Sequence, residues 1–102
     1  MTASTTPHAH RHLRDAVAAL CREGPLAERL DAAHRQLAAI DPVRDLPAAL
    51  QFRFEELVAD ITYGADTVAD ALARMSAPDR EHLALRVVSL FDDALRLLAA
   101  DA

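Results

Sequence analysis

Apolar residues recur along most of the chain at intervals of three and four positions, which places them on one face of a helix. Charged residues occupy most positions between them, so each segment is amphipathic. Four segments show this pattern, and their apolar faces consist of Leu13, Ala16, Val17 and Leu20; of Leu26, Leu30, Ala33, Leu37 and Ile40; of Leu50, Phe54, Leu57, Val58 and Ile61; and of the apolar positions between Leu83 and Leu98. The pattern predicts helices and no strand.

Capping residues predict where the first and last helices begin. Thr6 followed by Pro7 is typical of an N-cap with proline at the first helical position. Ser76, three residues before Asp79, resembles a capping box. The helix that starts there is expected to extend to about Ala99.

Prolines predict the middle boundaries. Pro42 ends the second helix, and residues 42–46 are expected to form a single turn. Asp45 or Leu46 then caps a third helix that begins at Pro47.

The two glycines mark further boundaries. Gly24 and Pro25 separate the first two helices, because glycine adopts the left-handed cap conformation and proline cannot continue a helix. Gly64 leaves two possibilities for residues 47–75. The apolar face stays in phase through it, which fits one long helix, whereas a break there would let Asp66 cap a separate helix. We favour a break or a kink.

These elements predict an all-α fold, an up-and-down bundle of four to five helices in a single domain. Residues 7–102 form the bundle, and residues 1–6 are expected to be a disordered tail. We expect the core to contain Leu13, Val17, Leu20, Leu30, Leu37, Leu50, Phe54, Leu57, Ile61, Leu72, Val87, Phe91 and Leu95.

Composition narrows the functional classes. The 102 residues are 52% hydrophobic, which excludes a disordered chain, and no apolar run is long enough to span a membrane. No secretory signal is recognisable, and one cysteine cannot staple a secreted fold, so we expect a cytoplasmic protein. All basic residues are arginines, which we attribute to a GC-rich bacterial genome. A net charge of -5 with dispersed arginines argues against a nucleic-acid partner.

The candidate metal and catalytic residues are few. His8, His10 and His12 alternate along the start of the first predicted helix, where successive members point about 200° apart and cannot converge on one ion. Cys21 has no adjacent base and is interpreted as a small hydrophobic residue at a helix edge. We therefore expect no enzyme activity, no metal and no cofactor.

Two Asp-x-x-His pairs, Asp31 with His34 and Asp79 with His82, resemble the Glu-x-x-His pairs of metal-binding bundles. The further ligands of such a site could come from Glu55, Glu56 and Asp60. The interior positions are apolar throughout, however, and aspartate is shorter than the motif requires. We interpret these side chains as surface residues.

Apolar residues outside the predicted core faces are the strongest functional signal. Phe52 and Tyr63 lie off the apolar face of their helix, and the last helix carries two apolar lines where a bundle needs one. We assign the surplus to an interface formed by Phe52, Tyr63, Leu83, Val87, Leu90 and Leu97.

The sequence therefore favours a non-enzymatic protein–protein interaction module: a small adaptor, an antitoxin or immunity factor, or a regulatory protein. It is expected to form a homodimer or to bind another protein. The alternative is a small metal- or ligand-binding bundle that uses histidine and carboxylate side chains. The two are distinguished by whether His34, His82, Glu56 and Asp60 converge.

Overall fold

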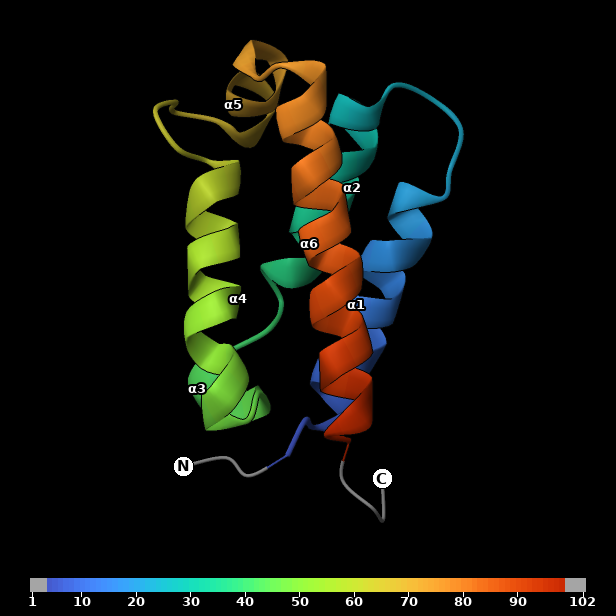
Figure 1. Cartoon of the computed structure of the whole chain (residues 1–102), viewed down its shortest axis with the longest axis vertical. Coiled ribbons are helices and arrows are strands. Elements are labelled where there is room, and N and C mark those ends of the chain that lie inside the picture. The colour runs from blue at the N-terminus through green and yellow to red at the C-terminus, as the bar shows by residue number, and fades with distance from the viewer. Residues whose placement is uncertain (1–3, 99–102) are drawn as a thin grey trace.

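The computed structural model describes residues 4–98, which contain six helices and no β-sheet (Figure 1). The helices are α1 (Pro7–Leu20), α2 (Leu26–Leu37), α3 (Pro42–Asp45), α4 (Ala48–Ile61), α5 (Val68–Arg74) and α6 (Ala77–Arg96). The four longer helices run alternately up and down, while α3 is a single turn and α5 is short. The predicted all-α bundle is confirmed. None of the described helices has the length and apolar character needed to cross a membrane.

The helices pack around α6. It contacts α1 and α2 on one side and α4 on the other, and α1 and α2 form a closely packed antiparallel pair (Figure 1). The short helix α5 lies at the end of the bundle where α4 stops and α6 begins, and it packs mainly on α2. This end of the molecule therefore consists of the end of α4, the connection that follows it, α5 and the start of α6.

Side-chain caps start four of the described helices, α1, α3, α5 and α6. The hydroxyl of Thr6 accepts a hydrogen bond from Ala9 N–H at 3.2 Å, and that of Ser76 accepts from Asp79 N–H at 3.2 Å, as predicted. At α4 the prediction is wrong, because Pro47 occupies the N-cap position and makes no side-chain cap. Asp45 instead belongs to α3.

The break at Gly64 is confirmed. Helix α4 ends at Ile61, and α5 begins only at Val68. Gly64 has a φ of +76°, a left-handed conformation that residues with a Cβ adopt at a cost of about 1–2 kcal/mol. The cap of α5 is Thr67, whose hydroxyl accepts from Asp70 N–H at 3.1 Å, and not the predicted Asp66.

Most of the predicted core residues are buried, and the three exceptions lie on α1 and α6. Val17 and Phe91 are half-buried, and Leu95 is exposed. Leu95 belongs to the second apolar line of α6, in which Ala84 and Phe91 are only partly buried, and its prediction as a core residue is wrong. The described core consists of Ala9, Leu13, Ala16, Ala19, Leu20, Leu30, Ala33, Leu37, Ile40, Leu46, Leu50, Phe54, Leu57, Ile61, Leu72, Leu83, Val87, Leu90 and Ala94.

The segment before α1 is tied to the bundle. Thr5 is buried, forms an isolated parallel bridge with Leu98, and donates its N–H to the carbonyl of Leu97 at 2.7 Å. Thr6 N–H donates to the carbonyl of Asp45 at 3.0 Å. The prediction of a disordered tail is therefore wrong for Thr5 and Thr6, because backbone partners distant in sequence order them. Residues 1–3 of that tail lie outside the described residues, as does Ala99.

Candidate functional site

Three of the six predicted interface residues are core residues. Leu83, Val87 and Leu90 are buried on the side of α6 that faces the other helices. Their assignment to an exposed interface is corrected: Val87 and Leu90 are enclosed by the fold, and Leu83 meets the surface only as part of the wall of a cavity. The sequence predicted two apolar lines on α6 correctly but placed the interface on the inner one.

The other three predicted interface residues reach the surface. Phe52 is 71% exposed on the outer side of α4, Tyr63 is 84% exposed in the turn that follows, and Leu97 is partly exposed beyond α6. On α6, the outward positions missed by the prediction are Leu85, Val88 and Leu95. The described surface thus carries large apolar side chains on both α4 and α6.

The three alternating histidines point to different partners. His8 Nε2 lies 3.0 Å from the carbonyl oxygen of Ala39, and His12 Nδ1 lies 2.9 Å from Gln36 Oε1, so both face the α2 side of α1. The ring of His10 instead stacks on that of Phe91, with centroids 5.7 Å apart. Successive histidines therefore diverge as predicted, whereas His8 and His12, one helical turn apart, lie together with ring centroids 4.6 Å apart.

The remaining candidate metal ligands are also dispersed. His34 is half-buried on α2, where desolvation lowers its pKa although the nearby Asp31 carboxylate acts in the opposite direction. His82 is exposed on α6, and the carboxylates of Glu56 and Asp60 contact Arg86. Among the described residues, no group of three or more His, Cys, Asp or Glu could hold a metal ion. Cys21 is exposed after the last turn of α1.

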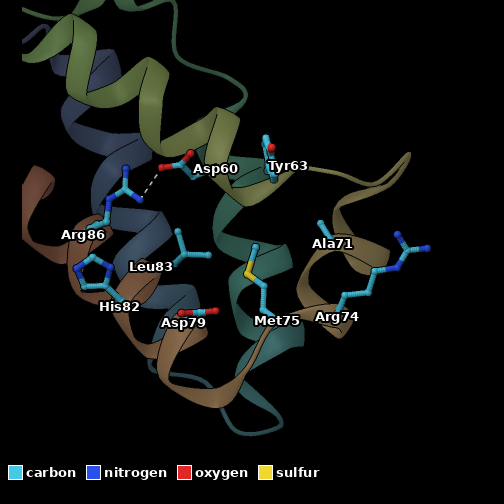
Figure 2. Close-up of a pocket in the computed structure, with 9 residues that line it drawn as sticks. All are labelled: Asp60, Tyr63, Ala71, Arg74, Met75, Asp79, His82, Leu83 and Arg86. Carbon is cyan, nitrogen blue, oxygen red and sulfur yellow. Dashed lines mark hydrogen bonds and ion pairs between the residues drawn. The ribbon is translucent and has the colours of Figure 1, made fainter.

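A cavity of about 410 Å³ lies between the end of α4, α5 and the first turns of α6 (Figure 2). Its lining residues are Asp60, Tyr63, Ala71, Arg74, Met75, Asp79, His82, Leu83 and Arg86. The apolar part is formed by the buried Ala71 and Leu83 together with the half-buried Met75. The sequence did not predict this cavity, because its walls come from three helices whose relative placement is set by tertiary packing.

The polar rim of the cavity is partly fixed by hydrogen bonds. Arg86 Nη1 donates to Asp60 Oδ2 at 2.9 Å (Figure 2). Arg86 Nη2 also lies 3.7 Å from Glu56 Oε1. On the other side, Arg74 Nη1 donates to the carbonyl of Gly64 at 3.3 Å. With Asp79, the lining contains two arginines and two aspartates, so it has no excess of either sign.

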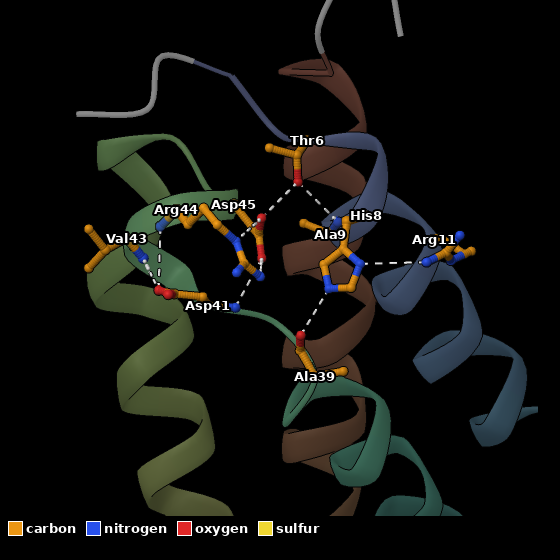
Figure 3. Close-up of polar contacts among 9 residues, drawn as sticks. All are labelled: Thr6, His8, Ala9, Arg11, Ala39, Asp41, Val43, Arg44 and Asp45. Atoms are coloured by element: carbon orange, nitrogen blue, oxygen red, sulfur yellow. Dashed lines mark hydrogen bonds and ion pairs between the residues drawn. The ribbon is translucent and has the colours of Figure 1, made fainter.

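The most buried charged group lies at the opposite end of the bundle. Asp45 is 3% exposed, and its carboxylate accepts hydrogen bonds from the Arg44 guanidinium at 3.0 and 3.1 Å (Figure 3). It also accepts from Asp41 N–H at 3.1 Å and from the Thr6 hydroxyl at 3.3 Å. The Arg44 hydrogen bonds lower the pKa of Asp45 most, and they outweigh the opposing effect of burial. Asp45 thus joins α3 to the start of α1.

Asp45→Asn is expected to lower the free energy of unfolding at neutral pH by about 1–3 kcal/mol, because the four part-buried hydrogen bonds to this carboxylate lose their charged acceptor. Since the pKa of Asp45 is lowered in the folded state, its contribution is present above the unfolded-state pKa and is lost as the pH falls through the folded-state pKa. Urea denaturation should therefore show the two proteins converging in acid. Asp41→Asn is the matched control: its Oδ1 caps α3, and asparagine caps equally well. Equal losses for both variants would contradict the role of Asp45.

Comparison of the chain with protein-family models, curated proteins and solved structures finds no match. Any functional assignment therefore depends on the geometry of this chain itself.

Proposed function

We propose that the protein is a non-enzymatic protein–protein interaction module that forms a homodimer. The observation that carries the proposal is the exposure of two aromatic residues, Phe52 and Tyr63, on and just after α4. Single exposed apolar residues are common on monomers. Two exposed aromatics exceed that expectation, since aromatic residues are enriched in interfaces.

A two-fold dimer is the simplest way to cover this surface. One patch then serves both copies, which is why closed two-fold symmetry is the commonest oligomer. Burying a large apolar side chain contributes about 1.5–3 kcal/mol, so a few of them support association. The net charge of -5 per chain opposes it weakly, because charges are screened beyond about 8 Å at physiological ionic strength.

The biological roles that fit such a module are an adaptor, an antitoxin or immunity factor, or a regulatory protein. Each acts by presenting a surface and needs no catalytic group. The single cysteine fits a reducing compartment, so the proposed location is the bacterial cytoplasm.

Sedimentation equilibrium of the wild-type protein tests the proposal. At high micromolar concentration we expect a species with twice the mass of one chain, and we expect it to persist in high salt because its contacts are apolar. Native mass spectrometry with metal analysis provides the control for the alternative function. A monomer throughout would overturn the homodimer and favour a different protein partner, whereas one chain with a stoichiometric metal ion would favour the metal-binding bundle.

A further inference from the structure

We propose that the homodimer forms by reciprocal insertion: Tyr63 of each copy enters the cavity between α4, α5 and α6 of the other copy. This inference rests on the proposed self-association and assigns its interface. The protruding side chain and the cavity belong to the same patch of surface, because Tyr63 itself stands at the rim (Figure 2). In a two-fold interface the same patch of both copies meets itself, so the inserted side chain and the cavity that receives it must lie side by side on one surface.

The backbone turn that carries Tyr63 is held by hydrogen bonds, and the residue itself is 84% exposed. Its N–H donates to the carbonyl of Asp60 at 3.5 Å, and the left-handed Gly64 follows it directly. Arg74 fixes the same turn through the carbonyl of Gly64. An aromatic side chain on a fixed turn loses little freedom on binding, which favours its use as an anchor.

The cavity has the size and chemistry to receive that side chain. At about 410 Å³ it is within the range of pockets that enclose whole small molecules, so one aromatic ring fits. Ala71, Leu83 and Met75 offer apolar contact to the ring. Asp79 lines the same cavity, and its carboxylate would accept a hydrogen bond from the tyrosine hydroxyl.

The charges of the rim are compatible with a second copy. A two-fold axis brings the same rim against itself, so a rim of one sign would repel its counterpart. Here Arg74 and Arg86 are balanced by Asp60 and Asp79. Arg86 and Asp60 already pair at 2.9 Å within one copy, so Arg74 and Asp79 are the groups of opposite sign that can approach each other between the copies. Tyr63, Arg74, Asp79 and His82 are exposed, so the cavity opens to solvent and a second protein surface would close it.

Substitution of Tyr63 tests the inference. Tyr63→Ala should raise the dimer dissociation constant at least about tenfold, because an aromatic anchor at the centre of the interface is removed. Tyr63→Phe keeps the ring and should change the constant by only a few-fold. Leu95→Ala is the matched control, since Leu95 is also exposed but lies at the other end of α6, and it should have little effect. Circular dichroism verifies that each variant is folded.

Mixing two variants tests the reciprocity. His82→Trp places a bulky ring at the mouth of the cavity, at an exposed position, and should weaken the homodimer as Tyr63→Ala does. The mixture of the two variants should associate more strongly than either alone, because the Tyr63→Ala copy keeps the other eight lining residues of its cavity and can receive the tyrosine of the His82→Trp copy. A wild-type dimer that Tyr63→Ala leaves intact, or a mixture with no gain, would overturn this inference alone. A wild-type monomer would overturn the proposed homodimer as well.

Discussion

Leu90→Glu is expected to unfold the protein. Leu90 is 1% exposed on the inner line of α6, so its replacement would place a carboxylate in the apolar core. Arg53 and Arg86 line the same hollow as Leu90, but they already pair with Asp93 and Asp60. An unpaired buried charge costs several kcal/mol, which is comparable to the whole stability of a small domain, about 5–15 kcal/mol. Far-UV circular dichroism should show loss of helix, and thermal scans should show no cooperative transition.

Leu85→Glu is the matched control, because it makes the same change on the same helix at a position that is 66% exposed. It should remain folded, with a midpoint close to that of the wild type. If Leu90→Glu folds and Leu85→Glu does not, α6 is rotated by about half a turn relative to the described packing. The pair of variants thus measures which side of α6 faces the core.

The rotation of α6 is the part of the fold that its own sequence leaves open. Both apolar lines are continuous, and their residues are similar in size, so periodicity does not distinguish them. What orients the helix is its packing between α1, α2 and α4. The predicted interface was placed on the inner line for this reason.

The positions of the charged residues on α4 and α6 indicate how the two helices are oriented against each other. Arg53 pairs with Asp93 at 2.6 Å, and Asp60 pairs with Arg86 at 2.9 Å. The two partners are seven residues apart on each helix and follow opposite chain directions, which is the spacing of an antiparallel pair. Matching charges between helices indicates the sides that face each other, and those sides exclude Leu85 and Leu95.

Local chemistry was predicted more reliably than tertiary contacts. The caps at Thr6 and Ser76 depend on side chains within three residues, and they were found from the sequence. The order of Thr5 depends on Leu97, and the burial of Asp45 depends on Thr6 from across the chain. Contacts between residues far apart in the chain leave no pattern in the neighbouring sequence, so the sequence predicts Asp45 as a helix cap and not as a buried group.

At the candidate site, too, local features were predicted from the sequence and tertiary features were not. The exposure of Tyr63 was predicted, because the residue lies off the apolar face of its helix. The cavity beside it was not, since it forms only when the break at Gly64 lets α5 pack across the end of the bundle. Of the nine lining residues, Tyr63 and Leu83 alone were assigned to the interface, and Leu83 contributes from inside the fold.

Leu57→Ala should lower the free energy of unfolding by about 2–5 kcal/mol, because Leu57 is 1% exposed and its truncation leaves a cavity that the surrounding helices fill only partly. Urea denaturation measures the loss, and Leu85→Ala, at an exposed position, should change it by about 0.5 kcal/mol or less. A loss below about 1 kcal/mol for Leu57→Ala would show that α4 does not pack by this face. Since Leu57 points inward, the variant should weaken folding without changing the dimer dissociation constant under conditions where the chain is folded. That separation of stability from association distinguishes the inner side of α4 from the turn that carries Tyr63.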